Sequence, residues 1–225
     1  MIPEEIITLN TLQKLDLFSN SISGIIPNGL SGLENLVSLD LQKNLLSGLA
    51  FPKAITGLRR LESYRISNNQ LVGGIPTRIG SLRGLKELWA GENEISGFIP
   101  SEIGDLRDLK TIIFSNNDLA GQLPSELGLI PLEGLLMNDN SFLGSIPSQL
   151  FNVASLNTFR LEGNFLVGTL PAVIGQLTDL EDFRVQNNNL SGQIPESIGF
   201  MTSLGKHFFN EDTNFNYRCL LFIDA

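Results

Sequence analysis

The chain has 225 residues, of which 42% are hydrophobic, and 15 lysines and arginines against 24 aspartates and glutamates give it a net charge of −9. This acidic balance, with no basic stripe, argues against nucleic acid as a partner and against an anionic membrane surface, since both recognise positive charge. No apolar run approaches the ~20 residues of a membrane span, and no charged-then-apolar leader opens the sequence. The single cysteine, Cys219, cannot form an internal disulfide.

A repeat of about 24 residues runs through almost the whole chain. Its columns are asparagine at 20, 44, 69, 93, 117, 140, 164 and 188; glycine at 24, 48, 73, 97, 121, 144, 168 and 192; and proline at 3, 27, 52, 76, 100, 124, 147, 171 and 195. Nine of the ten prolines therefore occupy one column. Such a fixed period predicts stacked structural units that share one continuous core.

The period slips twice, and each slip has a visible cause in the sequence. Ala50 reads as one inserted residue before Phe51-Pro52, and one residue is missing between Pro124 and Leu132, where the out-of-column Pro131 lies.

Taken in order, the chain is predicted to form a single solenoid domain over residues 1–212. A half-repeat covers 1–11 and is interpreted as a cut through a longer array. Repeats then start at 12, 36, 61, 85, 109, 132, 156 and 180, and a degraded repeat starts at 204. The tail, residues 213–225, fits no repeat, and two interpretations stay open, an improvised cap and a scar of splicing or truncation.

Each repeat opens with a short strand whose side chains alternate between the core and the solvent. In the first repeat Leu15 and Leu17 point inward, so Lys14, Asp16 and Phe18 point outward. Successive strands are expected to form one parallel sheet. The Gly-x-Ile-Pro segment suits a turn and a short extended piece, and Ile-Gly-x-Leu predicts a helical turn on the opposite side.

The consensus Leu-x-x-Leu-x-Leu-x-x-Asn-x-Leu-Ser-Gly-x-Ile-Pro-x-x-Ile-Gly-x-Leu resembles the plant-type leucine-rich repeat, from residue 2 to about 212. The resemblance implies an α/β solenoid, a right-handed superhelix with a parallel sheet on the concave face, a second short sheet beside Gly-x-Ile-Pro, and helical turns on the convex face. Similar proteins are ectodomains of receptor-like kinases and receptor-like proteins, and secreted inhibitors of polygalacturonases. The resemblance also implies an extracellular or cell-surface parent protein, although the cysteine pairs usual in the family's caps are missing here.

The asparagine column is predicted to be structural. A buried amide can donate and accept, so it can satisfy backbone groups where the strand ends. The predicted ladder consists of Asn20, Asn44, Asn69, Asn93, Asn117, Asn140, Asn164 and Asn188, and Asp212 marks its decay because an ionised carboxylate cannot donate.

No constellation in the sequence predicts catalysis. His207 is the only histidine and falls at an inward strand site, and Cys219 has no second cysteine or nearby histidine. Phosphate-loop, kinase and metal-ligand motifs are missing. The sequence therefore predicts a protein that is not an enzyme and that uses no cofactor or metal.

The outward strand positions are the informative ones, because packing does not dictate them. The central outward column reads Asp16, Asp40, Arg65, Trp89, Ile113, Leu136, Arg160, Arg184 and Phe208. Trp89, Ile113 and Leu136 follow one another and predict an exposed apolar patch for a partner, with Arg65, Arg160 and Arg184 around it to hold an acidic group. Two simpler explanations stay open: β-propensity or drift could produce three apolar residues in a row, and Glu162 and Asp182 could neutralise the arginines.

One N-glycosylation acceptor, Asn189-Leu190-Ser191, follows the last ladder asparagine and matters only in a secreted protein. The same three residues also arise readily from the repeat's own consensus.

These features favour a non-catalytic recognition module that binds a peptide or protein on its concave face. A second hypothesis is an inhibitor of an extracellular glycan-degrading hydrolase. A third, an ice-binding surface, needs a flat and regular polar array. The column after the strand does not provide one, because it reads Ser19, Lys43, Asn68, Glu92, Asn116, Asp139, Gly163 and Asn187.

Overall fold

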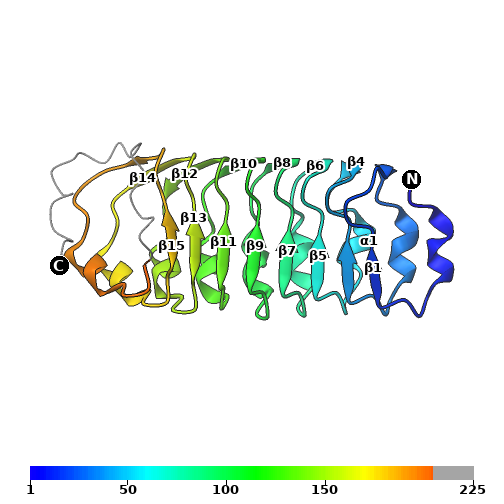
Figure 1. Ribbon diagram of the computed structural model, residues 1–225, viewed down its shortest axis with the longest axis horizontal. Coiled ribbons are helices and arrows are strands. Elements are labelled where there is room, and N and C mark those ends of the chain that lie inside the picture. Colours follow the sequence, from blue (N-terminus) through cyan, green and yellow to red (C-terminus); the bar gives the residue numbers. More distant parts are fainter. Residues whose placement is uncertain (205–225) are drawn as a thin grey trace.

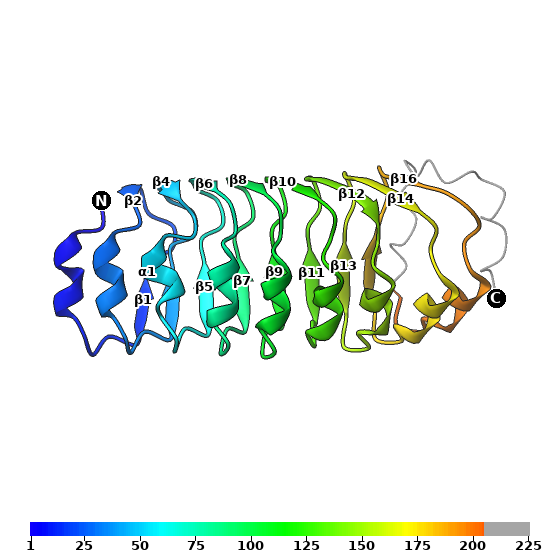
Figure 2. The same cartoon turned by 180° about the vertical axis from the view of Figure 1, so that it is seen from behind.

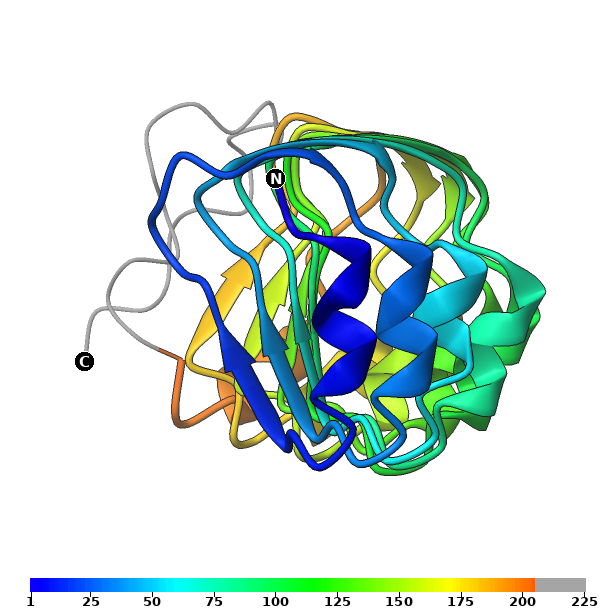
Figure 3. The ribbon, with the colours of Figure 1, turned by 90° about the vertical axis from the view of Figure 1, so that its right-hand side faces the viewer.

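The computed structural model describes residues 1–204 of the chain. Repeats stack side by side into an elongated solenoid, with strands on one long face and helical turns on the other (Figures 1 and 2). The end-on view looks along the stack and shows that each coil is offset from its neighbour (Figure 3). The features predicted for His207, Phe208, Asp212, Cys219 and the tail 213–225 lie outside the described residues.

The first sheet is parallel and takes one short strand from each repeat, as the repeat predicted. Its strands are neighbours in chain order: β1 (Lys14–Asp16), β3 (Ser38–Asp40), β5 (Ser63–Arg65), β7 (Glu87–Trp89), β9 (Thr111–Ile113), β11 (Gly134–Leu136), β13 (Thr158–Arg160) and β15 (Asp182–Arg184).

A second parallel sheet, which the resemblance implied, runs beside the first. It consists of β2 (Ser23–Ile25), β4 (Leu45–Leu49), β6 (Gln70–Gly73), β8 (Glu94–Gly97), β10 (Asp118–Gly121), β12 (Ser141–Ser145), β14 (Phe165–Gly168) and β16 (Asn189–Leu190). Each strand except the last ends at or just beyond its repeat's column glycine, and all these glycines have positive φ, between 78° and 93°.

The nine prolines of the column each precede a helical turn, because a φ fixed near −65° leads the chain into it. Eight of the turns are 3-10 helices and one is a short α-helix: η1 (Glu4–Thr8), η2 (Asn28–Gly32), α1 (Lys53–Thr56), η3 (Thr77–Ser81), η4 (Ser101–Asp105), η5 (Ser125–Leu129), η6 (Ser148–Asn152), η7 (Ala172–Gln176) and η8 (Glu196–Phe200).

Both slips in the period are absorbed locally. The inserted Ala50 is buried after a lengthened β4, and its carbonyl accepts a hydrogen bond of 2.6 Å from the hydroxyl of Tyr64. At the deletion, the residue after η5, Ile130, is extended (φ −100°, ψ 133°), whereas Leu106 after η4 has ψ 69°. The core itself is continuous between the sheets and the helical turns.

The asparagine column joins each repeat to the one before it. Asn117 Nδ2 donates to the carbonyls of Phe114 and Ser115 in its own repeat and, at 3.0 Å, to Ala90 of the preceding repeat. Its Oδ1 accepts from the backbone N–H of Ile95, again in the preceding repeat, at 2.9 Å. The same four-bond pattern recurs from Asn44 to Asn188. Within residues 1–204, the side chain of Asn20, in the first full repeat, bonds only to the carbonyls of Leu17 and Phe18.

The residue just before each ladder asparagine adopts a left-handed backbone conformation. Seven of these eight residues carry side chains and have φ between 52° and 58°, namely Ser19, Lys43, Asn68, Glu92, Asn116, Asp139 and Asn187. The eighth, Gly163, has φ 66°. Side chains other than asparagine and aspartate incur a steric cost there, which explains why five of the eight residues in the column are Asn, Asp or Gly.

We expect Asn117→Ala to lower the free energy of unfolding by about 1–3 kcal/mol, because it strands buried backbone groups in two repeats. Asn20→Ala is the matched control and should cost much less, since it removes no bond between repeats. Urea unfolding of both variants measures the difference, and equal losses would contradict the ladder as the source of cohesion.

We expect Glu92→Asn to raise the free energy of unfolding by roughly 0.5–1 kcal/mol, because asparagine tolerates the left-handed conformation better than glutamate. The control is Glu94→Asn, an exposed strand position two residues away, which should be neutral or destabilising. A stabilisation of the same size at both positions would point to the loss of negative charge instead.

Candidate functional site

The central outward column of the first sheet forms one continuous row. The strand register places Arg65 beside Trp89, Trp89 beside Ile113, and Ile113 beside Leu136. Leu136 is followed by Arg160 and then by Arg184. The six residues predicted to bind a partner are thus consecutive neighbours on six consecutive strands.

The apolar middle of this row is half-buried. Trp89, Ile113 and Leu136 are all of intermediate exposure, and none is among the strongly exposed apolar side chains. Gly91 and Gly134 are buried beside them: a Cβ on Gly91 would lie 3.2 Å from Ile113 Cγ2, and one on Gly134 would lie 3.5 Å from Leu136 Cδ1. The Trp89 indole N–H is buried and has no hydrogen-bond partner among the described residues.

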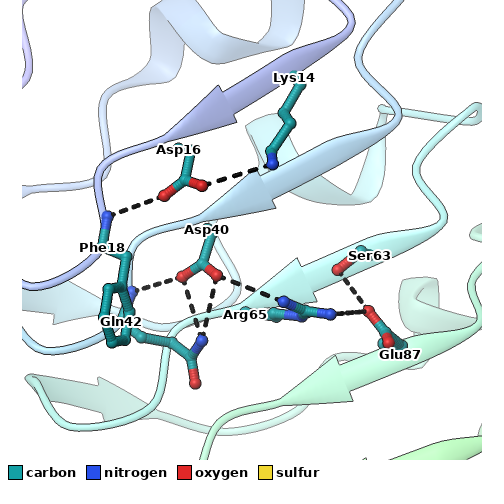
Figure 4. Close-up of polar contacts among 8 residues, drawn as sticks. All are labelled: Lys14, Asp16, Phe18, Asp40, Gln42, Ser63, Arg65 and Glu87. Atoms are coloured by element: carbon teal, nitrogen blue, oxygen red, sulfur yellow. Dashed lines mark hydrogen bonds and ion pairs between the residues drawn. The ribbon is translucent and has the colours of Figure 1, made fainter.

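Arg65 covers Trp89 and is itself held by two acidic residues. Its guanidinium carbon lies 4.1 Å from the centroid of the indole ring, a cation–π contact. Its Nη2 is 2.7 Å from Glu87 Oε2, and its Nη1 is 3.6 Å from Asp40 Oδ2 (Figure 4). Glu87 also accepts a hydrogen bond from the Ser63 hydroxyl, and Asp40 accepts from Gln42.

At the other end of the row, Arg160 and Arg184 share one carboxylate. Nε of each arginine donates to Asp182 at 2.8 Å, Arg160 to Oδ2 and Arg184 to Oδ1. Burial by itself would raise the pKa of Asp182, but the hydrogen bonds from Arg184 and Arg160 outweigh it and lower the pKa. Asp182 therefore stays ionised and neutralises one of the two positive charges.

Glu162 lies in the next outward column and is the least well satisfied acidic residue of the site. Its Oε2 is buried without a hydrogen-bond partner among the described residues. Burial raises the pKa of Glu162, although Arg184 and Arg160 act in the opposite direction.

The sequence predicted the positions of the arginines but only some of their partners. Asp182 was one of two candidates to neutralise Arg160 and Arg184, and it contacts both. The pairing of Arg65 with Asp40 and Glu87 had no counterpart in the prediction. It could have been found by aligning the outward columns, because the register sets Arg65 directly between Asp40 and Trp89.

A second group of exposed residues was missed altogether. The second sheet presents apolar side chains that are each 37–60% exposed, namely Ile25, Leu45, Leu49, Val72, Leu143, Phe165 and Val167. The sequence contains a signal for them. Between each ladder asparagine and the residue after the column glycine, buried and exposed side chains alternate, so the neighbours of the buried residues must face outward.

Within residues 1–204, no group of three or more histidine, cysteine, aspartate or glutamate side chains is placed to hold a metal ion. The same part of the chain contains no helix that is long and apolar enough to cross a membrane.

Comparison with known proteins decides the family. Leucine rich repeat family models match residues 10–71 and 179–201. A solved plant ice-binding protein is 31% identical, with a TM-score of 0.73, and the match covers 86% of this chain and 70% of that one. The chain belongs to the plant-type leucine-rich repeat family. No curated protein sequence matches it.

This leucine-rich repeat chain is also similar to two plant receptors solved with ligands. The peptide hormone receptor RGFR1 in complex with RGF2 is 35% identical over 90% of this chain, with a TM-score of 0.88. The ectodomain of the membrane receptor kinase GASSHO1/SCHENGEN3 from Arabidopsis thaliana, in complex with CASPARIAN STRIP INTEGRITY FACTOR 2, is 36% identical over 90% of it, also with a TM-score of 0.88. The chain spans 32% and 24% of the lengths of these two proteins.

The two acidic residues near the arginines should respond to pH with opposite signs. The folded-state pKa of Asp182 is lowered, so its contribution to stability is present above its unfolded pKa and is lost as pH falls through the folded value. The folded-state pKa of Glu162 is raised, so its ionised form destabilises the fold above that value. We expect Asp182→Asn to lower the melting temperature at pH 7, and Glu162→Gln to raise it.

The Glu162→Gln difference should narrow as the pH falls toward 4, because the carboxylate of Glu162 with its raised pKa takes up a proton there. The Asp182→Asn difference should persist to lower pH and narrow only below the unfolded pKa of aspartate. Thermal unfolding between about pH 3 and pH 8 measures both trends. A Glu162→Gln variant that is less stable than the wild type at pH 7 would contradict the assignment of Glu162 as a carboxylate strained by burial.

Proposed function

We propose that this chain is a non-catalytic recognition module of an extracellular protein and that it binds a peptide or protein ligand on its concave face. The observation that carries the proposal is the continuous row from Arg65 to Arg184, with an uncharged apolar middle between arginines at both ends. The related receptors RGFR1 and GASSHO1/SCHENGEN3 were solved in complex with ligands, and their likeness supports this class of function.

Trp89, Ile113 and Leu136 supply the apolar contact. When a ligand covers the exposed part of these side chains, the binding free energy gains ~25 cal/mol for each Å² of apolar surface removed from water. A central tryptophan is also typical of interface hot spots. The indole N–H of Trp89 offers a hydrogen-bond donor to the ligand. It is buried without a partner among the described residues of the free protein, which is energetically unfavourable. A ligand carbonyl that reaches it when Arg65 moves aside would recover that cost.

Arg160 and Arg184 orient an acidic group of the ligand. Each guanidinium has five N–H donors, and Asp182 occupies only part of them. The two side chains are 33% and 40% exposed, so a ligand carboxylate can approach from solvent. It must compete with Asp182, so the clamp favours a ligand whose carboxylate can contact both arginines at once.

Two other functions are separable by experiment. Inhibition of a glycan-degrading hydrolase predicts loss of enzyme activity on mixing, and a polygalacturonase assay tests it directly. Ice binding is named for one similar structure. In this chain, however, the column from Ser19 to Asn187 mixes charged, polar and glycine residues. We therefore expect no thermal hysteresis above that of albumin at equal concentration.

The ligand class is tested with a synthetic peptide library in which each peptide is made with a free C-terminal carboxylate and as the amide. We expect binders to prefer the free carboxylate or an acidic side chain. Arg160→Gln with Arg184→Gln should abolish that preference while weaker binding to the apolar row remains. If the wild type binds the free-carboxylate and amide peptides equally well, Arg160 and Arg184 do not bind an acidic group of the ligand.

Trp89→Ala should weaken the best peptide at least tenfold, since truncating a central anchor typically costs about 2 kcal/mol or more. Phe98→Ala is the control, because Phe98 is 70% exposed and follows a strand of the second sheet. Calorimetry gives the affinities and thermal unfolding the stabilities. Unchanged affinity together with a lower melting temperature would make Trp89 a packing residue.

A further inference from the structure

The acceptor Asn189-Leu190-Ser191 lies on the second sheet in a geometry that leaves the asparagine free for modification. Asn189 opens β16 and is exposed, and so is Ser191. The neighbours of Asn189 point the other way, since Asn188 makes the ladder bonds to Leu161 and Val185 and Leu190 packs against the core. A group attached to Asn189 would therefore extend away from the solenoid without disturbing the ladder.

Three exposed apolar side chains extend from this asparagine across the next two strands of the sheet, β14 and β12. Asn189 pairs in register with Val167 on β14, which is 45% exposed. Phe165 lies two residues before Val167 on the same face of β14 and is 60% exposed. Phe165 in turn pairs with Leu143 on β12, which is 48% exposed. Exposed serines at positions 141, 145 and 191 surround this group with hydroxyls.

We propose that Asn189 carries an N-linked glycan and that Leu143, Phe165 and Val167 form a platform on which its first sugar lies. The platform is apolar at its centre and hydroxyl-rich at its rim, which matches a pyranose ring with one C–H face and hydroxyls around its edge. Tethering to Asn189 brings the sugar to the platform without the cost of association that a free partner pays. The inference rests on the proposed extracellular location.

The modification is a group transfer. The Asn189 side-chain nitrogen forms a bond to C1 of an oligosaccharide carried on a polyisoprenyl pyrophosphate. The C1–O bond to phosphate breaks, the pyrophosphoryl lipid leaves with the electron pair, and the amide releases one proton. Ser191 supplies the hydroxyl that the acceptor motif requires.

The experiment secretes the full chain from a eukaryotic cell line behind a heterologous signal peptide. Site occupancy is read by peptide mass spectrometry. An endoglycosidase then trims the glycan to a single N-acetylglucosamine, and this form is compared with secreted Asn189→Gln in thermal unfolding. We expect Asn189 to be occupied and the single sugar to raise Tm by about 2–4 °C.

Variants of the platform test whether the sugar lies on it. In Phe165→Ser, and independently in Leu143→Ser, the Tm difference between the sugar-bearing form and its Asn189→Gln counterpart should fall to less than half. Phe98→Ser is the matched control, and it should leave the difference unchanged. Phe98 is an exposed phenylalanine just after β8, which is four strands from β16 in the same sheet.

An unoccupied Asn189 in the secreted protein would overturn the proposal. An occupied site with the same Tm difference in all three variants would overturn the platform. Ligand binding on the concave face is measured separately through Trp89, so failure of the glycan leaves the proposed function standing, and failure of ligand binding leaves the glycan result intact.

Discussion

The structure depends on the amide of one asparagine per repeat. At the end of each strand in the first sheet the chain turns inward, and the backbone groups exposed there have no ladder partner. Asn117 satisfies three carbonyls and one N–H with a single side chain, and two of these four groups belong to the preceding repeat. The amide therefore closes its own turn and fixes the spacing to its neighbour at the same time. A carboxylate could make only one of these four bonds, because it cannot donate.

This geometry constrains the residues next to the asparagine. The residue before it must adopt a left-handed backbone, and the glycine four residues later takes a positive φ as well. Except at Gly97, that glycine serves a second purpose, because the side chain after the preceding repeat's glycine packs over it. A Cβ on Gly48 would lie 2.9 Å from Ile25, and one on Gly121 would lie 2.3 Å from Phe98. Packing between repeats thus fixes both columns, and the outward positions are left free to vary.

The sequence predicted most of the fold because its columns report directly on these constraints. Periodicity located both slips, the inward strand residues such as Tyr64 and Phe114, and the prolines that precede the helical turns. It did not predict which outward side chains pair, because pairing depends on register between strands about 24 residues apart and on side-chain conformation. Arg65 and Trp89 illustrate this. Their positions were predicted, but the stacking of one on the other is a property of two neighbouring strands. The exposed apolar side chains of the second sheet were not predicted, because outward positions were assigned only to the strands of the first sheet.

The pairing within the row changes what the site can recognise. Three arginines on an acidic protein suggest a strong anion site. However, Asp40, Glu87 and Asp182 already neutralise most of the positive charge of these arginines. The desolvation of a new ion pair would offset much of its attraction, so bulk electrostatics contributes little to affinity here. Recognition then depends on shape and on the half-buried apolar residues between the charged ones. It also depends on whether a ligand carboxylate can bind Arg160 and Arg184 at the same time, since both arginines already contact Asp182. A ligand that fits only the charge gains little, whereas one that fits the apolar middle and the clamp together gains from both.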